Sequence, residues 1–211
     1  MGIFDLPDDG GRFGKFVRRL LGLPADGFVF GVFGNIHRVK RISVILNAFT
    51  QVRKSYPSAI LFMMGRVDVS ASDIILPLQD DVVGAREKGI YLHLAYVPYD
   101  FMLMAMQAID VGLNLRYPTV GETSASLSNL LGQRKPTIVS DVGSFREYPD
   151  TCCPKIPVDA REEEVLARRM MRFIEDNNYH KHAISAADDF VNGRTWAACA
   201  KQYLDFITDL L

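Results

Sequence analysis

Cysteine is scarce in this sequence, and its placement excludes two common kinds of site. The 211 residues include three cysteines, of which Cys152 and Cys153 are adjacent and Cys199 stands far along the chain. Three cysteines do not make a disulfide framework, and this set lacks the histidine spacing of a zinc site. Buried thiols in a reducing compartment are the simpler interpretation. We therefore expect no metal site and a cytoplasmic protein.

Excess charge and long apolar runs are also lacking. The 24 Lys and Arg residues nearly balance the 25 Asp and Glu residues, which does not favour nucleic acid or another polyanion as a partner. No run approaches the roughly 18 apolar residues of a membrane span, and the N-terminus lacks the apolar core of a signal peptide. We expect a globular chain with no transmembrane segment and no nucleic-acid partner.

Short apolar runs instead alternate with helical patterns along most of the chain. Runs of strand length occupy residues 28–33, 59–64, 90–95, 110–115, 136–140 and 155–158. Such alternation predicts right-handed β-α-β crossovers and a parallel sheet, and six strands suggest the order 3-2-1-4-5-6. The expected fold class is α/β: one Rossmann-like, doubly wound domain over residues 15–211, ending in helices. Residues 1–14 are expected to be a linker or disordered start.

Two polar loops are expected to meet at the switch point of that sheet, between the first and fourth strands. One is Gly34–Lys40 and the other is Arg116–Ser126. Open α/β sheets bind ligands in this crevice, at the carboxyl ends of their strands. The second loop opens a helix near Thr123 or Ser124, and a helix start offers unpaired N–H groups and a positive dipole. The two loops therefore predict a phosphate and sugar site.

Single residues in these loops fit that chemistry, and each also has a plainer interpretation. Lys40 would neutralise an anion, or would form a solvated basic patch with neighbouring arginines. Glu122 would accept hydroxyl protons from a sugar, or would only favour the helix dipole. Asn129 would bond a ribose hydroxyl, or cap a buried backbone group. Gly34 would let a ligand approach the backbone closely, whereas His37 is interpreted as an exposed loop histidine.

Together these segments resemble the donor-binding half of GT-B glycosyltransferases of the retaining, family-4 type. The resemblance covers nearly the whole chain from about residue 15 and is most specific around Glu122. The segments that carry it are Gly34–Lys40 with Ala48 and Phe49, Phe62–Gly65, Tyr117–Glu122 through Gly132–Ser140, Val142–Glu147, and Trp196–Phe206. It implies one Rossmann-like half of a two-domain enzyme.

Three positions depart from that family's pattern. Asn35 stands where an arginine is usual, and the Glu-x7-Glu signature has Gly121 at its first acid and Asn129 at its second. The resemblance implies that Glu122, one residue later, keeps the contact with the donor sugar. It also implies that Asn129 bonds the ribose without charge. Phosphate neutralisation would then rest on Lys40, helped by Arg38.

The resemblance implies a full set of donor-binding residues, in which Lys40 and Glu122 are catalytic. The base would lie against the loop after the third strand, although ordinary packing would equally explain Tyr96. The donor would be a UDP-, GDP- or ADP-sugar, with no metal, no cofactor and no protein nucleophile. The implied set is Gly34, Asn35, Arg38, Lys40, Tyr96, Val97, Gly121, Glu122, Thr123, Ser124, Ala125, Ser126 and Asn129.

The other half of such an enzyme, which binds a saccharide or lipid acceptor, is not found in this sequence. Residues 1–14 are too few to replace it, so we expect the chain alone to be inactive or weakly active. An acceptor domain would be able to hold this chain at a membrane surface. An exposed apolar patch near the last helix would mark where the two domains touch. Two alternatives stay open: a non-catalytic nucleotide-sugar-binding module or degenerate remnant, and another Rossmann-like nucleotide enzyme. The run Gly31–Ile36 lacks the dinucleotide fingerprint, which argues against NAD.

Overall fold

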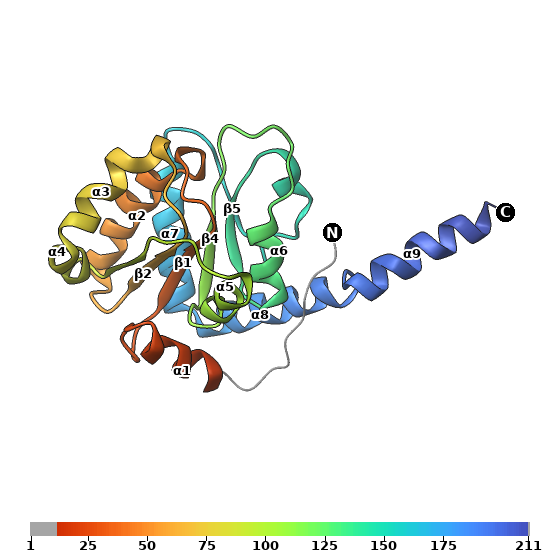
Figure 1. Cartoon of the computed structure of the whole chain (residues 1–211), viewed down its shortest axis with the longest axis horizontal. Coiled ribbons are helices and arrows are strands. Elements are labelled where there is room, and N and C mark those ends of the chain that lie inside the picture. Colours follow the sequence, from red (N-terminus) through yellow and green to blue (C-terminus); the bar gives the residue numbers. More distant parts are fainter. Residues whose placement is uncertain (1–11, 211) are drawn as a thin grey trace.

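The computed structural model describes residues 12–210, which contain a six-stranded parallel sheet with helices on both faces (Figure 1). The strand order is β3-β2-β1-β4-β5-β6 and every neighbouring pair is parallel. The predicted fold class and strand order are confirmed. The strands are β1 (Val29–Phe33), β2 (Ile60–Met64), β3 (Ile90–His93), β4 (Val111–Asn114), β5 (Thr137–Ser140) and β6 (Lys155–Ile156).

The four central strands are buried on both faces, which explains their continuous apolar runs. The two edge strands are shorter than predicted. β3 ends at His93, so residues 94 and 95 already belong to the following loop. β6 ends at Ile156, directly before Pro157, which has no N–H group for a ladder.

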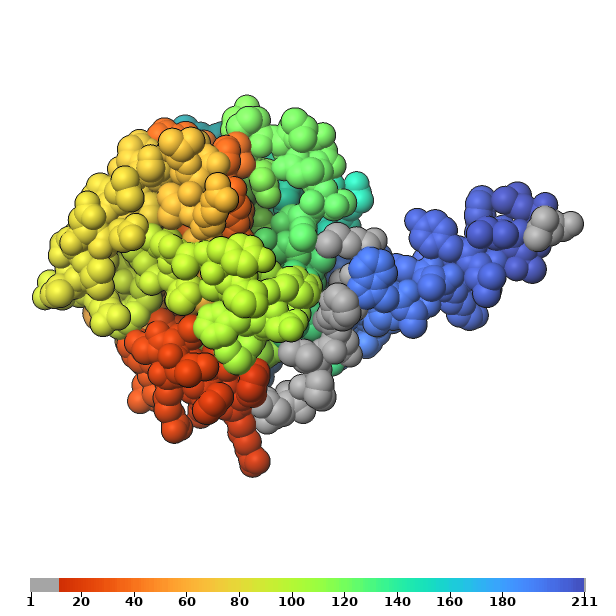
Figure 2. All heavy atoms as spheres, in the orientation of Figure 1, coloured from red at the N-terminus to blue at the C-terminus, as the bar shows by residue number. Residues whose placement is uncertain are grey.

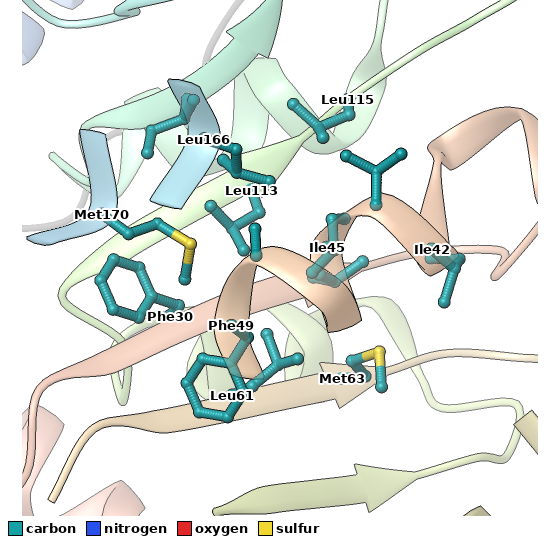
Figure 3. Packing of buried hydrophobic residues seen from close by; sticks show 14 of the residues in the cluster. Phe30, Ile42, Ile45, Phe49, Leu61, Met63, Leu113, Leu115, Leu166 and Met170 are labelled. Atoms are coloured by element: carbon teal, nitrogen blue, oxygen red, sulfur yellow. The ribbon is translucent and has the colours of Figure 1, made fainter. Parts of the chain in front are cut away.

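One face of the sheet is covered mainly by α2 (Ile42–Ser55) and α7 (Glu162–Glu175). Figure 3 shows Phe49 of α2 and Met170 of α7 lying among Phe30 and other strand side chains, all fully buried. Burying one such side chain stabilises the fold by about 1.5–3 kcal/mol. The part of this face nearest β3 is covered by η2 (Val69–Ala71), α3 (Ser72–Asp80) and α4 (Val82–Glu87).

The opposite face carries α1 (Arg12–Leu20), α5 (Tyr99–Met106) and α6 (Ala125–Gly132). Arg18 fixes α1 to the sheet, because it donates hydrogen bonds of 2.7 Å both to Asp110 Oδ2 and to the carbonyl of residue 108. Since α1 begins at Arg12, the last three residues of the expected linker are helical instead. Residues 1–11 of that linker lie outside the described residues.

Three elements complete the C-terminal part: η3 (Gly143–Glu147), α8 (Asn177–Asn192) and α9 (Trp196–Asp209). α8 packs against α6 and α7. α9 instead projects from the body of the molecule and buries none of its residues (Figures 1 and 2). Within residues 12–210, no helix combines the length and the apolar character needed to cross a bilayer.

Candidate functional site

The loop after β1 and the start of α6 meet over the carboxyl ends of the strands, as their positions in the sheet predict. A Cβ atom built on Gly34 would lie 2.8 Å from the Ser126 hydroxyl oxygen and 3.3 Å from the Lys40 Nζ. Gly34 has a φ of 84°, a conformation that favours glycine. The loops border an open cavity of about 370 Å³, which is lined by Asn35, His37, Val39, Lys40, Arg116, Thr123, Ser124, Ala125 and Ser126.

Lys40 brings a buried ammonium group to this cavity. It ends the short helix η1 (Arg38–Lys40), is only 7% exposed, and donates a 2.6 Å hydrogen bond from Nζ to the carbonyl of Phe33. Burial is the larger cause and the nearby charge of Arg116 the smaller one of a pKa of Lys40 that is lowered from its ordinary value of 10.5 to about 7. A buried cation is stabilised by an anion held beside it.

The first turn of α6 supplies partial positive charge to the same cavity. Ser124 is its N-cap, and its hydroxyl oxygen accepts hydrogen bonds from Leu127 N at 3.3 Å and from Asn114 Nδ2 at 2.9 Å. Because Ser124 and the two residues after it line the cavity, the helix N-terminus faces it. Helix N-termini favour anions through their free N–H groups and their dipole.

Arg116 is a second cationic side chain on this cavity, and it was not among the predicted site residues. It lies just beyond β4, separated from the last strand residue, Asn114, by Leu115, and its side chain is 17% exposed. Its Nε lies 3.4 Å from Oε1 of Glu122 and makes no hydrogen bond within residues 12–210, so the contact is an ion pair only. A charged residue just after a strand at the switch point was the signal that could have found it.

The carboxylate of Glu122 is held by its own loop. Oε2 accepts hydrogen bonds from the Thr119 hydroxyl at 2.8 Å and from Val120 N at 2.9 Å. These bonds lower the pKa of Glu122, with Arg116 contributing less, so the group is ionised at neutral pH. Glu122 belongs to the loop that borders the cavity but does not itself line the cavity. Its contact with a donor sugar stays a prediction.

Six other residues of the predicted set are also absent from the cavity lining: Gly34, Arg38, Tyr96, Val97, Gly121 and Asn129. Arg38 was expected to help Lys40, but Asp73 binds its guanidinium through two bonds of 2.7 and 2.8 Å. Tyr96 is 86% exposed, and Val97 is half-buried against the α1 and α5 side of the core. Gly121 is exposed, in a turn with a φ of 86°.

Asn129 is the remaining predicted residue, and the structure gives it a partner that neither sequence interpretation named. Its side chain is buried, and Oδ1 accepts a 2.9 Å hydrogen bond from the Tyr99 hydroxyl, which joins α6 to α5. A role towards a ribose stays a prediction.

His37 was interpreted as an exposed loop histidine, whereas it is half-buried and lines the cavity. Its Nδ1 accepts a 3.1 Å hydrogen bond from Val39 N, and its Nε2 lies 3.5 Å from Asp68 Oδ1.

Cationic groups therefore dominate the cavity. Lys40 and Arg116 line it together with a helix N-terminus, and none of the acidic side chains of residues 12–210 lines it. Such an arrangement suits a phosphate or diphosphate. Among residues 12–210 no group of three or more His, Cys, Asp or Glu is placed to hold a metal ion.

Comparisons with known proteins relate this geometry to one fold. No protein-family model matches the sequence, and no curated protein matches it. Solved structures match over nearly the whole chain. The C-terminal domain of LpcC, a group 1 family glycosyl transferase from Francisella tularensis, has a TM-score of 0.68 at 16% identity, with 91% of this chain and 95% of that chain covered.

Two larger proteins match with similar scores. Anabaena HepE in complex with UDP-glucose has a TM-score of 0.74 at 16% identity, with 97% of this chain and 54% of that chain covered. Sucrose-phosphate synthase from Thermosynechococcus elongatus has a TM-score of 0.71 at 19% identity, with 99% and 49% covered. The chain thus spans about half the length of these proteins. Its fold is that of the Rossmann-like half of a GT-B glycosyltransferase.

Proposed function

We propose that this chain is the donor-binding domain of a glycosyltransferase that uses a nucleoside diphosphate sugar. The observation that carries the proposal is the buried ammonium of Lys40 facing the N-terminus of α6 across one cavity. Both groups favour an anion of the size of a diphosphate. The structure of HepE with UDP-glucose supports the proposal, because it has the same fold.

In this proposal the protein acts mainly through electrostatics. Negative charge develops on the diphosphate as the bond to the sugar breaks, and Lys40 with the first N–H groups of α6 stabilises that charge. Glu122, whose side chain is 33% exposed, accepts a hydrogen bond from a hydroxyl of the donor sugar. The transfer retains the configuration of the sugar and needs neither a metal nor a protein nucleophile.

We propose further that turnover needs an acceptor-binding domain and that α9 contacts it. The helix is apolar along much of its length yet exposed: Tyr203, Leu204 and Phe206 are 72%, 64% and 63% exposed. Contiguous exposed apolar surface of this kind marks an interaction site. The acceptor would be a saccharide or lipid, and a domain of that kind would position it against the donor.

A second candidate is a nucleotide-sugar-binding module without turnover. It is favoured by the loss of expected cations, since Asn35 is uncharged and Arg38 is bound to Asp73. Both candidates bind a nucleotide-sugar, and they differ in whether the sugar is then transferred.

Titration calorimetry with UDP, GDP and ADP, and then with their sugar conjugates, tests the shared part. We expect one base series to bind with micromolar to millimolar affinity. A folded protein that binds none of them would overturn both candidates. Sugar transfer after an acceptor domain is supplied would select the first, and binding without transfer would select the second.

A further inference from the structure

We propose that Arg116 is the second phosphate-binding cation of this cavity and that Glu122 is its exchangeable counter-ion. This inference rests on the proposed function and names a residue that the resemblance does not supply. It places the second positive charge at the end of β4, instead of in the loop after β1 where position 35 lies.

Two like charges meet at this cavity from distant parts of the chain. Lys40 ends η1 and Arg116 follows β4, and both line the same cavity of about 370 Å³. Burial is the first cause of the lowered pKa of Lys40 and the like charge of Arg116 is the second, as expected for two cations that line one cavity. Like charges in a partly desolvated cavity are unfavourable without an anion between them. A bound diphosphate would convert this repulsion into two attractions.

The other basic and neutral candidates near the cavity are engaged or uncharged. Arg38 is held by both carboxylate oxygens of Asp73, outside the cavity. Asn35 lines the cavity but has no charge, and the ring of His37 is held by Val39 N and lies near Asp68. Among the residues that line the cavity, Arg116 is thus the guanidinium that can take the place of the family's usual arginine.

The contact between Arg116 and Glu122 has the character of an exchangeable pair. The two groups are 3.4 Å apart without hydrogen-bond geometry, and the Arg116 Nε is buried. Glu122 does not depend on Arg116, because Thr119 and Val120 already bond its Oε2. A guanidinium binds a phosphate through two parallel hydrogen bonds, which is stronger than a loose ion pair. Arrival of the diphosphate would therefore draw Arg116 from Glu122 to the ligand.

The test measures the affinity of the full chain for inorganic pyrophosphate and for the nucleoside diphosphate that binds best. Arg116→Met should weaken both by about 10- to 100-fold, the range for losing a charged hydrogen bond. Arg116→Lys should recover part of that loss. Arg134→Met is the matched control, because Arg134 is similarly buried, pairs with Asp188 at 2.7 Å, and lies at the other end of α6. It should leave affinity within about twofold.

Two further readouts separate ligand binding from a structural role. Arg116→Met should raise the pKa of Lys40, measured from the Cε chemical shift by NMR, because a neighbouring positive charge is gone. Glu122→Gln keeps the shape of the side chain and removes the competing charge. It should therefore tighten pyrophosphate binding by a few-fold. Circular dichroism and melting curves of each variant check that the fold is retained.

The outcomes distinguish this inference from the proposed function. If the wild-type protein binds no diphosphate, both are overturned. If it binds and Arg116→Met binds equally well, the role of Arg116 is overturned while the donor site at Lys40 stands. If Arg116→Met does not fold, Glu122→Gln decides: pyrophosphate binding that is no tighter than that of the wild-type protein would contradict the proposal.

Discussion

Gly34 follows β1 and Ser126 lies in the first turn of α6, far along the chain, yet the two residues are so close that no side chain fits between them. A Cβ atom on Gly34 would lie 2.8 Å from the Ser126 hydroxyl oxygen, closer than real Cβ contacts allow. The loop after β1 is thereby pressed against the first turn of α6. Next to this contact, Lys40 and the first turn of α6 line the same cavity.

Replacing Gly34 should consequently damage both stability and binding. We expect Gly34→Ala to destabilise the protein by about 1–3 kcal/mol, because its φ of 84° strains any other residue and the new methyl group meets Ser126. Urea unfolding measures the change. Gly22→Ala is the matched control, since Gly22 has a φ of 67° and open space around its Cβ position. Equal losses in the two variants would refute crowding at Gly34.

Lys40 should give the stability of the protein a specific dependence on pH. Its pKa is lowered from 10.5 to about 7 in the folded state, so between these values the unfolded chain binds more protons than the native protein. Stability therefore rises as pH increases from about 7 to 10, by at most about 1.4 kcal/mol per pH unit from this group.

The difference between wild-type protein and Lys40→Met isolates this contribution from other titrating groups. Denaturant unfolding at several pH values should show the wild type gaining on the variant as pH rises. Arg116 and His37 line the same cavity and are unchanged in both proteins, so their own effects on stability largely cancel in the difference. If the free energies of unfolding of the two proteins change in parallel with pH, Lys40 does not have a lowered pKa in the folded protein.

An ion pair between α2 and α7 should contribute measurably to stability. Glu162 is 2% exposed, and Arg41, at the start of α2, donates to it from Nε at 3.0 Å and from its terminal nitrogen. Glu162→Gln should cost about 2–3 kcal/mol, because a charged hydrogen-bond partner is lost while Arg41 stays partly buried. Thermal unfolding tests this, with Asp159→Asn as the exposed control. Equal melting temperatures for both variants would show that the buried pair adds nothing.

The arrangement of the fold was predictable from the sequence, because apolar runs alternate with helical segments and crossovers in parallel sheets have one hand. That reasoning placed the loop of Gly34 beside the loop of Glu122, and the contact between Gly34 and Ser126 confirms it. Element ends were less certain. The strand predicted to reach Ala95 ends at His93, and α1 begins inside the expected linker.

The composition of the cavity was harder to predict, because it depends on side-chain partners far apart in sequence. Arg38 looked available beside Lys40, but Asp73, which lies 35 positions away, binds it. Asn129 was interpreted as a ribose ligand or a cap; the structure adds a hydrogen bond from Tyr99 on another helix, and the ribose role stays a prediction. The spacing of the family motif predicts a cation at position 35 and gives no reason to consider Arg116. That Arg116 lines the cavity is clear only when β4 is placed next to β1 in the sheet.

The most direct test of the central claim is calorimetric titration of pyrophosphate and of UDP, GDP and ADP into wild-type protein and Lys40→Met at pH 7. The account predicts that wild-type protein binds one nucleoside diphosphate, and that the variant binds it about 10- to 100-fold more weakly. It also predicts proton uptake on binding, seen as a dependence on buffer ionisation enthalpy, because an anion raises the pKa of Lys40 from about 7. Equal affinity in the two folded proteins, with no proton uptake, would contradict it.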